Sequence, residues 1–409
     1  MGTSISTATS VGARIQRARR SKKMSQAALA GLVERSESWM RGVEAGRINL
    51  DKHSVIDRLS AVLEVEVSWL LGQPFDMSQG TGHDAVPALR TALRRTSLSL
   101  SGHRGLRSAA PQSSLTDLRA DVDRITRRRQ AANLLEVMRQ LPDLTESLNT
   151  AILMASGIER DVVSGLVVET SHVARTILNQ LGYHDLAWTA VENSAAAAAR
   201  LGAPLMVAWS AWDRCGVLLH TESVGEAFTV AETALTELEE IMKEPTPQVL
   251  SLWGALNLRC AVASARRNDA VSAWAFLAEA ELAADRLGAD RNDFQTVFGP
   301  TNCDIHAVEI AVALDRPDIA LKRHASINLA GLQSKERHTR HHIEVAHAYC
   351  RLKHDAAAVD QLKHAASLAP EYVYNHHTVR DLIIELHGRA QPSAIDAGLG
   401  VFERAMRLQ

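Results

Sequence analysis

The side chains best suited by type and spacing to chemistry are histidines in the segment from Glu336 to His342. His338 and His342 are four residues apart, so on a helix their imidazoles would share one face, a spacing that can hold a metal ion. No third ligand and no neighbouring carboxylate is fixed by the sequence, and the segment is rich in charges typical of a solvated face. We therefore predict no metal site and no cofactor.

Motifs of the common enzyme classes are missing from the sequence. It has no glycine-rich phosphate loop, no nucleophile elbow and no HExxH pair. Isolated Asp, His and Ser side chains are plentiful, but they form no recognisable catalytic constellation. The sequence therefore predicts a protein that is not an enzyme.

The composition is that of a soluble, mostly helical protein. The 409 residues suffice for two or three domains, and 46% are hydrophobic and 22% charged. Alanine and leucine are abundant and aromatics make up only 4%, which favours helix over sheet. No apolar run is long enough for a membrane span, and the Ser/Thr-rich residues 1–10 lack the core of a signal peptide. We expect a disordered tail at 1–10 and a cytoplasmic location.

Charge is unevenly distributed along the chain. Residues 1–75 contain 11 Lys and Arg against 7 Asp and Glu, a net charge of +4, whereas the whole chain carries −2. A modest basic excess at one end suits an acidic partner for that end.

Residues 11–75 show the pattern of five short amphipathic helices. Ser25 and Ser36 are placed to act as N-caps of the second and third helices, because their hydroxyls can accept from backbone N–H groups of the first turn. Leu29 and Leu32 would face the core from the second helix. An all-α domain is therefore predicted over this range.

From Ser25 to Gly46 this segment resembles the phage-repressor/Cro-like (XRE) helix-turn-helix family without a gap, in a style similar to actinobacterial members. One departure is that Glu34 and Arg35 occupy turn positions where the family usually has Gly and an aliphatic residue. The residues that carry the resemblance are Ser25, Gln26, Leu29, Ala30, Ser36, Glu44 and Gly46.

The resemblance implies that the unit binds double-stranded DNA, with its third helix in the major groove. Arg41 would then grip a guanine through O6 and N7, and Ser38 would pair with several bases. The further contacts to bases or phosphates implied in this way come from Gln26, Arg35, Ser36, Glu37, Arg14, Arg17 and Arg47.

Other charged residues of the unit have simpler interpretations. Glu37 and Arg41 are four residues apart, so they can also pair with each other on a solvated face. Glu44 is expected to be structural. The cations Arg19, Arg20, Lys22 and Lys23 are expected to be mostly solvated.

The second half of the chain repeats itself. Alanines spaced by seven occur as Ala227 with Ala234, as Ala273 with Ala280 and as Ala358 with Ala365, and small residues at that spacing let antiparallel helices approach closely. The pattern resembles a degenerate tetratricopeptide (TPR) array, with about five helix pairs between residues 165 and 372. Cysteines recur at intervals of 45, 43 and 47 residues, so we expect each on the first helix of a pair, in a structural role; they are Cys215, Cys260, Cys303 and Cys350.

Such an array forms a superhelix whose concave face is lined by the first helix of each pair. That groove suits a peptide or a partner's helix, although Trp209 and Trp212 can equally fill space between helices. The residues expected to line it are Glu169, His172, Trp209, Trp212, Asn302, Glu309, Arg340, His347 and Arg351.

The predicted organisation is an N-terminal domain at 11–75, a linker with a short helix at 76–114 and a TPR-like domain at 115–409. This architecture resembles the peptide-pheromone-responsive regulators of quorum sensing. It implies a homodimeric transcription regulator that senses a peptide or a small ligand. Two alternatives stay open: a non-enzymatic interaction protein that holds a protein partner, and a constitutive dimeric repressor without an effector.

Overall fold

The computed structural model is all-helical over the residues it describes, as the sequence predicts. Among them there is no strand, only one isolated backbone pairing between Arg291 and Phe298. None of the described helices is long and apolar enough to cross a membrane. The predicted tail at 1–10 lies outside the described residues, which are 11–22, 24–45, 55, 58–59, 62–63, 83–103, 113–221, 223–332, 334–389, 392 and 397–405.

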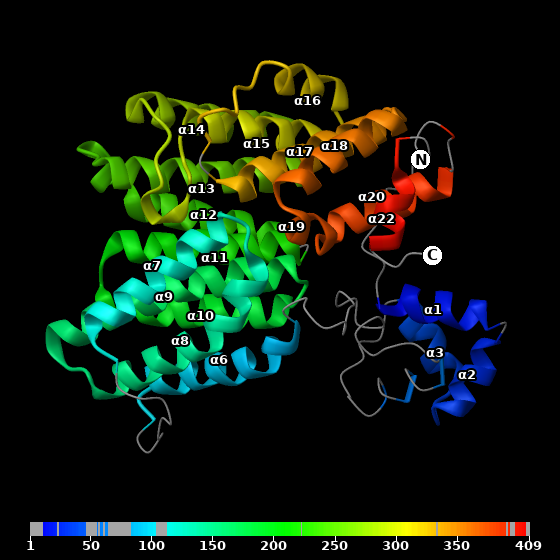
Figure 1. The fold of residues 1–409 in the computed structure, drawn as a ribbon, viewed down its shortest axis with the longest axis horizontal. Helices are drawn as coiled ribbons and strands as arrows, with labels where there is room; N and C mark the ends of the chain where they lie inside the picture. Colours follow the sequence, from blue (N-terminus) through cyan, green and yellow to red (C-terminus); the bar gives the residue numbers. More distant parts are fainter. Residues whose placement is uncertain are drawn as a thin grey trace. The chain divides into compact units, whose positions relative to one another are not determined.

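The chain divides into two compact units, residues 1–77 and 78–409 (Figure 1). The short helix expected in the linker is α6 (Val86–Leu100), with Pro87 in its first turn. It belongs to the larger unit, because Leu89 and Leu93 are buried in the same core as α8 (Leu134–Met154). The segment predicted as a linker therefore contains a structural helix of the second unit.

In the described part of the smaller unit the helices are α1 (Val11–Ser21), α2 (Gln26–Leu32) and α3 (Glu37–Glu44). Both predicted N-caps are confirmed: Ser25 accepts from the N–H of Ala28 at 3.0 Å, and Ser36 accepts from that of Trp39 at 3.1 Å. The core of this unit contains Ile15, Leu29, Met40, Val43 and Leu59. Most of the predicted fourth and fifth helices lies outside the described residues.

Two local features place α2 and α3. Glu34, in the turn between them, has a φ of 55°, a left-handed conformation that Gly adopts most easily. This conformation accounts for the Gly that the family usually has at this turn. Glu34 also forms an exposed ion pair with Arg58 at 2.7 Å. Gly12 lets α1 approach α3 closely, since a Cβ there would lie 2.1 Å from the carbonyl oxygen of Val43.

The larger unit stacks five helix pairs in chain order, which confirms the predicted helical repeats (Figure 1). The first helices also contact one another in sequence, so they form one layer, here called the inner layer. Its helices are α9 (Gly157–Gln180), α11 (Pro204–His220), α13 (Pro247–Arg266), α15 (Pro300–Ala313) and α17 (Lys335–Arg351). Their partners are α10 (His184–Leu201), α12 (Val224–Leu238), α14 (Ala270–Leu287), α16 (Pro317–His324) and α18 (Asp355–Leu368).

The repeat signals of the sequence have the expected structural roles. The alanines at the seven-residue spacing are all buried, on the second helices of their pairs. The four cysteines lie on α11, α13, α15 and α17, one on each, and all are buried free thiols. Small side chains thus set the close approach of the helices, and the cysteines pack as small apolar residues.

The ends of the repeat array meet. Helix α7 (Leu115–Gln130) contacts both α9 and α17, the first helices of the first and fifth pairs. Helix α19 (Pro370–Tyr374) follows the fifth pair and returns to α8, where the backbone N–H of Leu135 donates to Glu371 at 3.2 Å. The side-chain amide of Gln180 donates to the carbonyl of Tyr372 at 3.2 Å. The array is therefore closed on itself, and α20 (His377–Arg389) and α22 (Leu399–Ala405) pack on its C-terminal end.

Candidate nucleic-acid interface and the inner layer

Helix α3 presents a polar face and buries an apolar one. Glu37, Ser38 and Arg41 are exposed, whereas Met40 and Val43 are buried. Because the exposed residues lie in the first turns of the helix, they are the ones that would enter a groove first. The geometry thus keeps the predicted base-reading residues accessible.

Arg41 and Glu37 form the ion pair that their spacing allows, with Nη2 and Oε1 3.0 Å apart. Both side chains are largely exposed, so such a pair contributes at most about 1 kcal/mol and is easily exchanged for another partner. Arg35 lies over the ring of Trp39, with its guanidinium carbon 5.6 Å from the ring centre. Ser36 is engaged as the N-cap, and its hydroxyl is exposed.

A buried polar network connects α1, α2 and α3. Arg19 donates to both carboxylate oxygens of Glu44, at 2.6 and 2.9 Å, and Gln26 donates to Glu44 at 2.7 Å. Burial raises the pKa of the Glu44 carboxyl, but the hydrogen bonds from Arg19 and Gln26 outweigh it, and the net shift is downward. Glu44 therefore stays ionised and structural, as predicted.

Two expectations for this unit are wrong. Arg19 is not the solvated cation that the sequence predicts: only 8% of it is exposed, because its guanidinium is hydrogen-bonded to the buried carboxylate of Glu44. Leu32 was expected to face the core, but it is 56% exposed, because α2 ends there and the turn points it outward. Of the other predicted contacts, Arg14 is half-buried and Gln26 is engaged with Glu44. The side chain of Arg17 and the whole of Arg47 lie outside the described residues.

The nine side chains predicted to line a groove all lie on inner-layer helices. Several have polar partners within the chain, whereas Nε1 of Trp209 and Oδ1 of Asn302 are buried without a hydrogen-bond partner. Glu169 pairs with Arg119 of α7 at 2.8 Å, and Glu309 pairs with Arg340 at 2.8 Å. His347 and Arg351 hydrogen-bond each other at 3.3 Å, and Arg351 is the exposed member of the set. The other members, which are buried, are His172, Trp209, Trp212 and Asn302.

Within the inner layer, Asp213 of α11 joins that helix to α9. Its carboxylate accepts from Nδ1 of His172 at 2.8 Å and from Arg175 at 2.5 Å. Burial raises the pKa of Asp213, but Arg175 and His172 more than offset it, and the pKa falls to about 2. Burial lowers the pKa of His172 to about 4 against the attraction of Asp213. The imidazole is therefore neutral at pH 7, and the carboxylate is charged.

Arg259 of α13 is an inner-layer cation with an open hydrogen-bond donor. It is buried, its Nε has no hydrogen-bond partner, and its guanidinium lies over Trp212 at 4.7 Å from the ring centre. Burial, together with the nearby Arg175, Arg340 and Arg337, lowers its pKa to about 9. The sequence analysis did not single out Arg259, Arg175 or Asp213; their shared position on first helices is the signal that could have found them.

A loop between α14 and α15 covers part of the inner layer. Phe294 packs edge-on against Trp209, with ring centres 5.4 Å apart, and Gln295 accepts from Arg129 of α7. Phe298 lies against Gly254, where a Cβ would be 1.8 Å from the ring. Phe294, Gln295 and Val297 all have positive φ, an uncommon backbone for residues with side chains. The chain thus fills this region with a strained segment of its own.

Comparison with known proteins assigns the class of the smaller unit. Residues 10–68 match the family model described as a helix-turn-helix domain. The N-terminal unit is therefore a helix-turn-helix domain of the kind the resemblance indicated, and the match does not extend to the larger unit.

No curated protein matches the chain. Among solved structures, the chain is similar to PlcR of Bacillus thuringiensis in complex with the peptide PapR7 and DNA, at 10% identity and a TM-score of 0.34. The similarity covers 69% of this chain and 96% of that one. A TM-score this low supports no conclusion about a shared ligand, and the assignment of the larger unit to the TPR family stays a prediction.

The Arg19–Glu44 pair gives a first prediction. Glu44→Gln should destabilise the N-terminal unit by about 3–5 kcal/mol, because it leaves Arg19 buried without a counter-charge. The measurement is thermal unfolding of the full chain, with Glu37→Gln as the exposed control that should change stability by less than about 1 kcal/mol. If Glu44→Gln were as stable as the wild type, the Arg19–Glu44 pair would not be required for the stability of the N-terminal unit.

The neutral buried histidines give a second prediction. Burial lowers the pKa of His172 to about 4 and that of His306 to about 3, whereas the unfolded values lie near 6.5. Below about pH 6.5 these histidines are protonated in the unfolded chain but stay neutral in the folded protein. For each of them the free energy of unfolding should therefore fall by about 1.4 kcal/mol per pH unit, until the pH reaches its folded pKa.

Denaturant unfolding of the larger unit at several values between pH 7.5 and 5 measures this slope. His172→Gln should reduce it, while His354→Gln, at an exposed position, should leave it unchanged. The assignment fails if the slope in His172→Gln equals that of the wild type.

Proposed function

We propose that this protein is a cytoplasmic, sequence-specific transcription regulator that binds DNA through α3 as a homodimer. The observation that carries the proposal is the helix-turn-helix match over 10–68, combined with the exposed face of Glu37, Ser38 and Arg41 on α3. A dimer would place two such helices about 34 Å apart, one helical turn of DNA, and read a near-palindromic site.

In this proposal Gln26 positions α3 rather than contacting DNA. Its hydrogen bond to Glu44 ties the start of α2 to the end of α3. Arg41, Ser38 and Glu37 read bases, while Arg14, Arg17, Arg35, Ser36 and Arg47 are the candidates for phosphate contacts, which set affinity rather than sequence choice.

We further propose that the larger unit senses a peptide or small ligand that carries an acidic group. Arg259 is a buried cation whose Nε lacks a partner, and it faces three other arginines that lower its pKa. A carboxylate would relieve that repulsion and satisfy the open donor.

A second candidate function is a constitutive regulator whose larger unit only dimerises. It is favoured by the closed array and by the partners that the chain itself supplies to Glu169, His172 and Glu309. The interaction-protein alternative has no specific observation in its favour.

The DNA-binding proposal predicts the effect of Arg41→Ala. Once genome-wide binding-site mapping has identified an operator, this change should cost about 1–3 kcal/mol of operator affinity at fixed salt, because a bidentate contact to guanine is lost. Fluorescence anisotropy measures the affinity. Arg316→Ala, which removes the same charge from an exposed position in the larger unit, should change it little. Unchanged affinity in Arg41→Ala would show that α3 does not read the operator in this register.

The same assay tests effector sensing. A fractionated culture extract should change the operator affinity of the wild type, and Arg259→Gln should lose that response while it keeps the basal affinity. A protein that always co-purifies would support the interaction-protein alternative. If no fraction changes the affinity, the constitutive regulator is the better account.

A further inference from the structure

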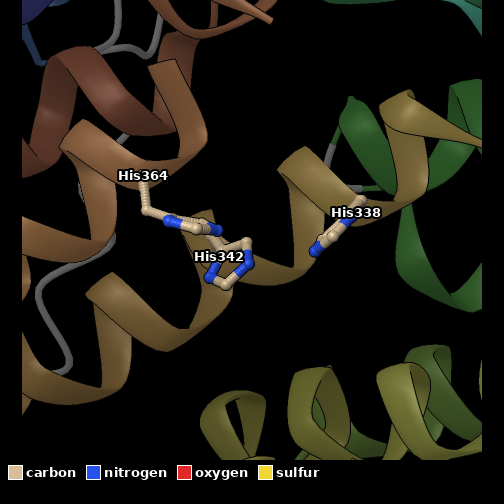
Figure 2. Close-up of side chains that lie close together, drawn as sticks. All are labelled: His338, His342 and His364. Atoms are coloured by element: carbon tan, nitrogen blue, oxygen red, sulfur yellow. The ribbon is translucent and has the colours of Figure 1, made fainter. Parts of the chain in front are cut away.

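Three imidazoles from the two helices of the fifth pair converge. His338 and His342 lie one turn apart on α17, and His364 comes from α18. Each offers a ring nitrogen, and these atoms all lie within 4.8 Å of one another. Figure 2 shows His342 in the middle of the group, with His364 reaching it from the neighbouring helix and His338 from the preceding turn. The structure thus supplies the third ligand that the sequence does not fix.

We propose that His338, His342 and His364 bind one divalent transition-metal ion of the Zn²⁺ class and thereby clamp α17 to α18. Imidazole nitrogens select such ions, whereas Mg²⁺ and Ca²⁺ require oxygen ligands. Three protein ligands leave a fourth position for water, and the site opens to solvent because His364 is exposed. This inference concerns the larger unit alone and is independent of DNA binding.

The hydrogen bond between His342 and Gln361 leaves Nε2 of His342 free to bind a metal ion. Nδ1 of His342 lies 2.8 Å from the side-chain oxygen of Gln361. A carbonyl oxygen can only accept, so Nδ1 carries the proton and Nε2 carries the lone pair. Nε2 is buried and has no hydrogen-bond partner. A ligating histidine whose other nitrogen donates to an oxygen is the usual arrangement around a bound metal ion, because that bond fixes the tautomer and the ring orientation.

The required adjustment is small. Nitrogens that share a tetrahedral ion at about 2.1 Å lie about 3.4 Å apart, so the ligand atoms must close by roughly an ångström. The exposed ring of His364 can rotate to do this, and its ring centre is already 4.3 Å from that of His342.

A second pair of histidines next to the site is already hydrogen-bonded to each other. His324 and His341 share a hydrogen bond, with Nδ1 and Nε2 2.8 Å apart, so one nitrogen of each is already used. This pair is the alternative ligand set that the experiment must separate from the proposed one.

The test uses the full chain without a polyhistidine tag, stripped with a chelator and desalted. Zn²⁺ is titrated in competition with a chromophoric chelator, and bound metal is counted by elemental analysis. We expect one ion per chain and a thermal midpoint that rises with Zn²⁺, because the ion binds only the folded site. Absence of binding by the wild type would overturn the proposal.

Variants identify the ligands. His364→Gln removes an exposed ligand, so the fold should be kept. Gln361→Leu removes the hydrogen bond to His342 and should weaken Zn²⁺ binding by about 10–100-fold. His364→Gln, which removes a ligand itself, should weaken Zn²⁺ binding at least as much. His354→Gln is the matched control at another exposed histidine and should bind like the wild type. The assigned ligand set would be overturned if His364→Gln bound Zn²⁺ as tightly as the wild type. It would also be overturned if His324→Gln lost Zn²⁺ binding while His364→Gln kept it.

Discussion

Buried ion pairs between different helices constrain the packing of both units. Asp213 of α11 is held by two side chains of α9, and Arg129 of α7 is held by Glu336 of α17. In the N-terminal unit, Glu44 of α3 is held by Arg19 of α1. Since removal of one partner strands the other in a medium of low dielectric, each pair fixes which helices are neighbours and at what register.

The features that could be predicted from the sequence are local. An N-cap such as Ser36 needs only the next three residues, and the alanines at spacing seven report the close contact of a helix with its neighbour. The positions of the four cysteines on first helices follow from the same repeat. Glu44 could be given a structural role, and the family match over 10–68 agrees with the gap-free register found from Ser25 to Gly46.

The features that could not be predicted depend on contacts between distant residues. Arg19 and Glu44 are 25 positions apart, and Arg129 and Glu336 are 207 apart, so no local pattern connects them. Periodicity placed Trp209, Trp212 and His172 correctly on the first helices, but it cannot show what covers a face. The covering groups, α7 and the segment at Phe294, come from elsewhere in the chain. His364 escaped notice for the same reason, because its two partners lie on a different helix.

The closure of the array has a consequence for how the larger unit folds. In an open repeat protein each unit contacts only its neighbours, so stability is nearly a sum of local terms and an end can fray without disturbing the rest. Here the hydrogen bond between Leu135 and Glu371 spans 236 positions. Such contacts form late and slowly, since a long loop must close before they contribute. The five pairs should therefore gain and lose structure as one cooperative body, with no free end from which unfolding can spread.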